Sequence, residues 1–411
     1  MNNEGIMKKR WLYLGISTLA LLFLGLIYAW SIFKAPFSEL FTTWTVGQLS
    51  MTFTISMICF CLGGFVGGLT SKKLSLKLRL FISAVALFVG FFGVSLLNTA
   101  DAAGSLTKLY IFYGVLGGGG VGYAYNAIIG AITKWFPDKV GLASGILLMG
   151  FGFGGLILGS IVNAMIGNMG IFPVFRILGI AIAVVMVLCA IFVRLPGEGD
   201  ILPVASKAAK AGDDAVEVKS YTAGEMMKTA TFWLFVLWIV LMNSAGLLVI
   251  NSAASISIAF GGSAALGMII SLFNGAGRIF TGTMFDAKGR KPISYINNIF
   301  LLLSGALMAV GGITNSLIPV VIGLILMGMC YGGNPTITSA YINAAYGPKN
   351  FATNFSIANF SLIPASLIGP TVSSKLLEAS GGSYQTNFYA ILAFGAAALV
   401  FNVILNKVSK E

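Results

Sequence analysis

The chain has 411 residues, of which 57% are hydrophobic and only 9% are charged, and its net charge is +12. Soluble domains carry about 25% charged residues, so this composition excludes an ordinary water-soluble domain. A basic soluble protein would suggest nucleic-acid binding. Here the basic residues are expected to flank membrane helices, and no basic, aromatic-rich domain is present to bind a polynucleotide. We therefore predict a multi-pass protein of the cell inner membrane that binds no nucleic acid.

Twelve apolar segments have the length of a membrane span, since a hydrocarbon core of about 30 Å requires about 20 residues of helix. A polar segment, residues 195–229, separates the first six spans from the last six. The predicted fold class is therefore all-α, with an N-terminal six-helix bundle at 1–194, a cytoplasmic linker at 195–229 and a C-terminal six-helix bundle at 230–411. The predicted spans are 11–33, 48–70, 79–98, 108–133, 140–165, 172–194, 230–252, 262–285, 292–313, 317–341, 351–373 and 386–406.

The basic residues predict the orientation of these spans. With the N-terminus inside, 20 of the 25 Lys and Arg residues fall on the cytoplasmic side. Four fall outside, and the remaining one, Arg278, lies within a span. Cytoplasmic loops carry an excess of Lys and Arg, so both termini are expected in the cytoplasm. The four outer residues are Lys34, Lys108, Arg176 and Lys375.

The two halves of the sequence resemble each other. GGFVGGLTSKKLSLK (63–77) ends the second span, GRIFTGTMFDAKGRK (277–291) ends the eighth, and both place glycines before a basic turn. YAYN (123–126) in the fourth span parallels YGGN (331–334) in the tenth. A parallel repeat of six spans is the simplest account, so the two bundles are expected to be related by pseudo-two-fold symmetry. Chance similarity between glycine-rich helices is the alternative.

The residues needed for catalysis or metal binding are scarce. The chain has no His, and its four Cys residues lie within apolar runs, where Cys behaves as a small apolar side chain. A membrane enzyme would need a nucleophile and a base, or metal ligands, near one face. We therefore predict no enzyme activity, no catalytic residue, no metal and no cofactor.

Arg278 is the residue that the membrane environment does not explain. It precedes Asp286, at the predicted cytoplasmic boundary, by eight residues, which places it about 12 Å into the membrane. Exposing it to lipid would cost at least ~2.5–3.5 kcal/mol. All thirteen acids fall in loops, in tails or at span ends, so an ion pair inside the protein is disfavoured. The sequence thus predicts that a substrate anion supplies the counter-charge. Asn274 lies four residues earlier, on the same helix face. Its amide can add a hydrogen bond to the anion or hold the orientation of Arg278, and helix packing is the alternative.

The stretch GTMFDAKGRKP (282–292) resembles the cytoplasmic loop signature of the major facilitator superfamily. The resemblance covers the whole chain, because the layout of six spans plus six also agrees. It implies a loop that latches the inner ends of helices in the outward-open state, although simple topology signalling by positive charge is the alternative. In the first half, Ser71 or Lys72 replaces the acid. The matching residues are Gly282, Asp286, Gly289, Arg290 and Lys291.

Within that superfamily the sequence resembles the oxalate:formate antiporter and monocarboxylate transporter group. The resemblance rests on GLIYAWSIF (25–33), YNAIIGAITKWFPDKVGLASG (125–145) and NGAGR (274–278). The last stretch is similar to the pattern that binds the substrate carboxylate in this group. The resemblance therefore implies carboxylate binding by Arg278 and Asn274, during alternating access in which the two halves rock about a central site.

The same resemblance implies that tyrosines line the central site. Tyr123 is preferred over Tyr125, because Tyr123 is predicted near the midplane, about 16 Å from Lys134, and shares a helix face with Asn126. A phenol can donate to a carboxylate while its ring packs on a short carbon chain. Helix packing is the alternative for Tyr123 and Tyr331. The further candidates are Tyr331, Asn334, Tyr28 and Tyr389.

The sequence departs from the oxalate antiporters at the eleventh span, where a second cation, a lysine, is expected and none occurs. With one positive charge near the midplane, a dianion would keep one buried charge uncompensated. The predicted substrate is thus a monocarboxylate such as lactate, pyruvate or formate, and the predicted function is secondary active transport. Exchange of oxalate for formate is the alternative function, and sensing of such anions is a further one. Coupling to a proton and exchange for a counter-anion both remain open. We expect a monomer in the lipid bilayer.

Overall fold

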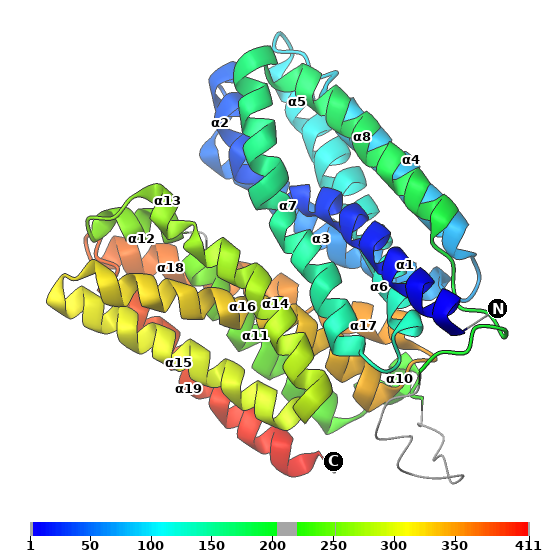
Figure 1. The fold of residues 1–411 in the computed structure, drawn as a ribbon. Helices are drawn as coiled ribbons and strands as arrows, with labels where there is room; N and C mark the ends of the chain where they lie inside the picture. The colour runs from blue at the N-terminus through cyan, green and yellow to red at the C-terminus, as the bar shows by residue number, and fades with distance from the viewer. Residues whose placement is uncertain (1–2, 204–219, 251, 410–411) are drawn as a thin grey trace. The chain divides into compact units, whose positions relative to one another are not determined.

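The computed structural model describes residues 3–203, 220–250 and 252–409, and this part of the chain is almost entirely helical (Figure 1). Residues 204–219 of the predicted linker lie outside the described residues. The chain divides into two compact units. Unit 1 comprises Met1–Asp138, Gly150–Val216 and Phe351–Ser356. Unit 2 comprises Lys139–Met149, Glu217–Asn350 and Ile357–Glu411. The predicted boundaries at 1–194 and 230–411 stay a prediction, because these contact-defined units are built from several segments.

Unit 1 contains the helices of the first six predicted spans. The first span is interrupted by a 3₁₀ turn, η1, and the fourth is a continuous helix of 34 residues whose middle, η2, is a π-helix. The elements are α1 (Asn3–Leu24), η1 (Gly25–Ala29), α2 (Trp30–Leu40), α3 (Val46–Thr70), α4 (Leu76–Val94), α5 (Ala102–Leu109), η2 (Tyr110–Gly117), α6 (Gly118–Trp135), α7 (Val140–Met169) and α8 (Ile171–Phe192). The first residues of α7 belong to unit 2.

Unit 2 contains the helices of the last six predicted spans and three short helices. Two of these, α12 and α13, pack on each other in the connection between the seventh and eighth spans, and α10 precedes the seventh. The elements are α10 (Ala223–Met227), α11 (Ala230–Ile250), α12 (Ala253–Ala259), α13 (Ala264–Gly267), α14 (Ile269–Lys288), α15 (Arg290–Thr314), α16 (Leu317–Tyr346), α17 (Phe351–Asn359), α18 (Leu362–Ala379) and α19 (Gln385–Val408). The start of α17 belongs to unit 1.

Eleven helices among the described residues are long and apolar enough to cross a membrane. The remaining predicted span, the eighth, corresponds to α14, which begins later than expected and ends at Lys288. Arg278, Asp286 and Lys288 lower the mean hydropathy of α14, so composition alone does not mark it as a span. Its length of 20 residues is about 30 Å of helix, which suffices to cross the hydrocarbon core.

Glycines bring α3 and α6 of unit 1 into backbone contact. A Cβ atom added at Gly118 would collide with the carbonyl of Ser56, and one at Gly122 with the carbonyl of Phe60. Small residues permit this approach, which membrane helices use in place of the hydrophobic effect, since lipid tails are as apolar as side chains. Because glycine has no side chain, Gly118 and Gly122 determine where the backbone of α6 contacts that of α3.

Unit 2 repeats this packing between α14 and α16, which run side by side (Figure 1). A Cβ atom at Gly328 would collide with the carbonyl of Ile270, and one at Gly332 with the carbonyl of Asn274. The spacing of the glycines and of the carbonyls is the same as in unit 1. The repeat that the sequence indicated is thus visible as a repeated helix crossing inside each unit.

The register of this repeat differs from the one predicted for the fourth and tenth spans. Because Gly122 corresponds to Gly332, Tyr123 corresponds to Gly333 and Asn126 corresponds to Thr336. The predicted equivalence of YAYN with YGGN is therefore wrong by two positions. The predicted register matched the Tyr and Asn residues of the two segments, whereas the backbone contacts of Gly122 and Gly332 define the register in the structure.

We predict that Gly122→Ala and Gly332→Ala each destabilise the protein, because the added methyl group would force α6 or α16 away from a neighbouring backbone. Overpacking of this kind costs about 1–3 kcal/mol. The measurement is thermal unfolding of the purified protein in detergent. Gly167→Ala is the matched control, since nothing lies within 4 Å of a Cβ atom at that position of α7. Equal melting temperatures for all three variants would contradict the assigned helix crossings.

Candidate functional site

Arg278 lies in the middle of α14, and only 4% of its surface is exposed. Its Nε donates a hydrogen bond to Oδ1 of Asn274 over 3.1 Å, and its Nη1 donates to the backbone carbonyl of Leu148 on α7. All three residues belong to unit 2. The predicted pairing of Arg278 with Asn274 across one helical turn is present, whereas the bond to Leu148 was not foreseen. Both of these acceptors are uncharged, so neither neutralises the guanidinium.

Glycines hold the start of α7 against α14. A Cβ atom at Gly145 would lie 2.6 Å from the carbonyl oxygen of Arg278, and Gly141 and Gly282 meet each other's backbone carbonyls. The two helices therefore approach at the level of their backbones. This approach brings the Leu148 carbonyl, one turn beyond Gly145, within reach of the Arg278 guanidinium.

Asp138 and Asp200 each form an ion pair with an arginine other than Arg278. Asp138 pairs with Arg10 at 2.6 Å, and Asp200 pairs with Arg194 at 2.6 Å. The guanidinium of Arg194 and the Gly197 amide hold the pKa of the Asp200 carboxyl down at about 2. Since Asp200 therefore stays ionised throughout the physiological range, this pair holds the segment after α8. These contacts agree with the expectation that the acids lie at helix ends and in loops.

The predicted gating residues gather where α14 turns into α15. The carboxylate of Asp286 accepts hydrogen bonds from the backbone amides of Gly141, at 2.8 Å, and Leu142, at 2.7 Å. These amides form the N-terminus of α7, where unpaired N–H groups and the helix dipole favour an anion. We name this contact the Asp286–α7 clasp. Asp286 is therefore placed where a negative charge is stabilised by another helix.

The remaining motif residues shape the same turn. Gly289 has a φ of +79° between α14 and α15, a backbone conformation that favours glycine. Arg290 is buried, with its guanidinium carbon 5.4 Å from the centroid of the Tyr341 ring. Lys291 is half-buried and follows it on α15. The structure thus brings Gly282, Asp286, Gly289 and Arg290 into one connected region of unit 2.

Tyr123 and Asn126 contact the end of α3 and the start of α4. The Tyr123 hydroxyl is 2.8 Å from Thr70, the last residue of α3, and its ring lies 5.9 Å from the guanidinium carbon of Arg79 at the start of α4. Asn126 accepts from Arg79 and donates to the carbonyl of Ala352. The structure thus places Tyr123 and Asn126 beside the connection between α3 and α4, and the depth predicted for Tyr123 stays a prediction.

Asn334 is part of a buried chain of amides. Its Oδ1 accepts from Asn297 at 2.8 Å, and its Nδ2 donates to Asn243 at 2.9 Å. These bonds join α11, α15 and α16, so Asn334 helps to pack the three helices. Tyr331 packs its ring against Gly246 of α11, where a Cβ atom would collide with it.

Tyr28 belongs to an aromatic cluster in unit 1 that includes Tyr125. Phe151 lies at the centre of this cluster, with its ring centroid 5.3 Å from that of Tyr28 and 5.0 Å from that of Tyr125. Phe60 and Phe355 also contact Tyr125. The preference for Tyr123 over Tyr125 passed over this group. Its members lie on different spans and carry no spacing pattern, so only the tertiary fold reveals them.

Tyr389 is 49% exposed on α19, on the same face as Val400 and Ile404, which are also exposed. The opposite face of α19, with Ile391 and Leu405, is buried. An exposed apolar face is what a membrane helix presents to lipid. The structure therefore does not bring Tyr389 together with the other candidates.

Within the described chain, no group of three or more His, Cys, Asp or Glu residues gathers in a way that could hold a metal ion. Cys61, Cys189 and Cys330 are buried within the spans, where they act as packing residues.

The chain thus has two units with a repeated helix crossing, helices of membrane length and a buried arginine. Together these features define a multi-pass membrane transporter. The chain belongs to the Major Facilitator Superfamily, whose profile it matches over residues 11–361. The predicted family and fold class are therefore confirmed, and the protein is a transporter, not an enzyme.

Three similar proteins place the chain within this family. The oxalate:formate antiporter of Oxalobacter formigenes is 26% identical over 413 residues, covering 98% of this chain and 93% of the antiporter. Human monocarboxylate transporter 12 is 30% identical over 139 residues, which is 33% of this chain and 25% of that protein. The solved structure of the proton:xylose symporter XylE, 16% identical, superposes with a TM-score of 0.75 over 99% of this chain and 96% of XylE. The last similarity bears on the fold alone.

We predict that Asp286→Asn speeds hydrogen exchange at the amides of Gly141 and Leu142 about tenfold or more. The reason is that a hydrogen bond to a charged group contributes about 1.5–3 kcal/mol, more than one to a neutral amide. Mass spectrometry of peptides from 139–149 measures this exchange. Asp101→Asn, which removes the charge capping α5, should leave those peptides unchanged. An unaltered rate in the Asp286 variant would contradict the Asp286–α7 clasp.

Proposed function

We propose that this protein is a secondary active transporter of small organic anions, with monocarboxylates of the lactate, pyruvate or formate type as its substrates. It works by alternating access, and the substrate carboxylate binds Arg278. The observation that carries this proposal is the Arg278 guanidinium, buried in the middle of a membrane-length helix and hydrogen-bonded to uncharged acceptors. An intramembrane charge of this kind is by default a substrate or ion site.

The carbonyl of Leu148 occupies a guanidinium donor that a carboxylate can take over. A bond from a guanidinium to a charged oxygen is about twice as strong as one to a neutral oxygen. The planar guanidinium also matches both oxygens of a carboxylate. An arriving anion therefore competes favourably with Leu148, while Asn274 keeps the guanidinium oriented. In this scheme binding of the anion releases one contact between α14 and α7.

The charge of the substrate follows from the cations available. The eleventh span of this chain lacks the second cation expected in oxalate antiporters. Lys375, which follows that span, is exposed on α18, beyond the part that α17 forms. A dianion would then bring two charges to a single guanidinium, and burying the second is costly. This argument favours a monocarboxylate, as does the similarity to monocarboxylate transporter 12.

Exchange of oxalate for formate is the second candidate function. It is favoured by the similarity to the oxalate:formate antiporter, which extends over 98% of this chain. A sensor of such anions is a third candidate, and uptake by the purified protein separates it from the first two. The Asp286–α7 clasp is proposed as a latch, because breaking it would free the N-terminus of α7.

We predict that Arg278→Gln lowers anion uptake into liposomes at least about 30-fold, since losing one partner of a buried charge pair costs about 2–5 kcal/mol. Arg278→Lys should keep partial activity, because an ammonium retains the charge but lacks the planar geometry. Arg176→Gln is the matched control, as Arg176 is exposed on α8. Gel filtration of each variant verifies folding. Normal uptake by a folded Arg278→Gln variant would refute carboxylate binding at Arg278.

We predict that uptake of lactate, pyruvate or formate exceeds uptake of oxalate in a liposome panel of labelled anions. Each anion is tested with and without a trapped counter-anion, and with and without a pH gradient. A requirement for the counter-anion identifies exchange, and stimulation by an inward proton gradient identifies symport. Faster uptake of oxalate, dependent on trapped formate, would replace the proposed function by the second candidate.

A further inference from the structure

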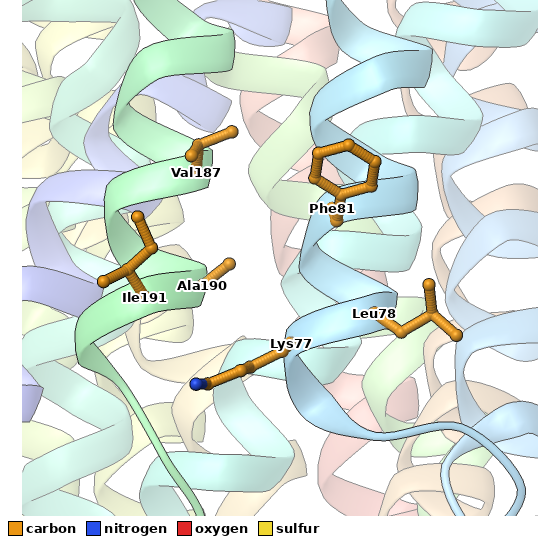
Figure 2. Close-up of a pocket in the computed structure, with 6 residues that line it drawn as sticks. All are labelled: Lys77, Leu78, Phe81, Val187, Ala190 and Ile191. Carbon is orange, nitrogen blue, oxygen red and sulfur yellow. The ribbon is translucent and has the colours of Figure 1, made fainter.

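A groove of about 330 Å³ lies on unit 1 between the beginning of α4 and the end of α8 (Figure 2). Lys77 is the second residue of α4, and Ile191 is the last but one of α8. The groove therefore sits at one end of two adjacent membrane-length helices. It is lined by Lys77, Leu78, Phe81, Val187, Ala190 and Ile191.

The hollow exists because Ala190 is small. Figure 2 shows Phe81 on α4 and Val187 on α8 on opposite sides of the groove, with the Lys77 side chain extending from α4 toward the end of α8 below Ala190 and Ile191. All of the lining side chains except Lys77 are apolar. The groove thus combines an apolar interior with an ammonium group at its end.

The surroundings of the groove face the bilayer. Phe81 is 53% exposed, Ile191 is 59% exposed and Phe192, the last residue of α8, is 56% exposed. Large apolar side chains with this exposure on membrane-length helices are in contact with lipid. An apolar hollow among them suits an acyl chain better than water, because water in it would find no hydrogen-bonding partner.

The charge at the end of the groove selects the headgroup. Lys77 follows Lys72 and Lys73 in the turn that leads into α4, all on the side that the basic residues predict to be cytoplasmic. Basic residues near that surface attract anionic lipids, with about 1 kcal/mol for each Lys or Arg. A zwitterionic lipid offers no net charge to this cluster.

We propose that this groove is a binding site for an anionic phospholipid, with one acyl chain in the hollow over Ala190 and the phosphate on the ammonium of Lys77. The site is separate from Arg278 and does not depend on which anion is transported. The lipid would bridge the ends of α4 and α8 and so stabilise unit 1.

Native mass spectrometry of the full-length protein in mild detergent tests this proposal. Phosphatidylglycerol and phosphatidylcholine with identical acyl chains are titrated separately, and we expect phosphatidylglycerol to bind more tightly. Lys77→Gln should weaken its binding about fivefold, equivalent to ~1 kcal/mol. Lys349→Gln is the matched control, since it removes an exposed lysine that is on the same predicted side and does not line the groove. Equal affinities for the two lipids, or equal effects of the two variants, would overturn the proposal.

A second variant tests the hollow itself. Ala190→Leu places a larger side chain in the groove and should abolish the phosphatidylglycerol adduct that Lys77→Gln weakens, while Ala393→Leu, at an exposed position of α19, should not. Gel filtration verifies that both variants are folded. If Ala190→Leu instead keeps the lipid adduct, or dissociates a dimer of the wild-type chain, the groove is not a lipid site and the proposal fails.

Discussion

Backbone-to-backbone contact through glycine is the interaction on which both the fold and the candidate site depend. Inside a bilayer, helices gain little from hiding apolar side chains, because lipid is equally apolar, and close approach supplies the attraction instead. Gly277 and Gly332 bring α16 onto α14, and Gly141, Gly145 and Gly282 bring α7 onto the same helix. The helix that carries Arg278 is therefore held by neighbours on more than one side.

This packing determines what Arg278 can contact. A guanidinium in hydrocarbon requires hydrogen-bond acceptors, and the close approach of α7 supplies a backbone carbonyl, that of Leu148. Such an acceptor satisfies a donor without cancelling its charge. If Arg278 binds the substrate carboxylate, as we propose, the anion would take over a donor that a neutral oxygen otherwise holds. A bond from a guanidinium to a charged oxygen is stronger than one to a neutral oxygen, so this contact suits anion binding.

The sequence was a good guide wherever the signal was local. Membrane spans follow from apolar length, and the pairing of Arg278 with Asn274 follows from a spacing of four residues on one helix. Leu148 escaped notice because a backbone carbonyl, 130 residues away, leaves no mark in the sequence. The depth of Tyr123 in the membrane stays a prediction, because it was counted along one helix, whereas its contacts with Thr70 and Arg79 come from tertiary packing. Tyr125 was passed over because its partners come from separate spans, which only tertiary packing brings together.

The corrected register of the repeat shows how the two units have diverged. The contact of Gly63 with Gly119 corresponds to that of Gly277 with Met329, so the position equivalent to Arg278 in unit 1 is Gly64.

The same register makes Phe60 the counterpart of Asn274, because both carbonyls meet the equivalent glycine of the next helix. Phe60 joins the aromatic cluster of Tyr125 and Phe151, while Asn274 binds Arg278. One repeat therefore carries a charged, polar version of this crossing and the other carries an aromatic one. The two units have therefore kept the backbone geometry of this crossing while the side chains beside it diverged in chemistry.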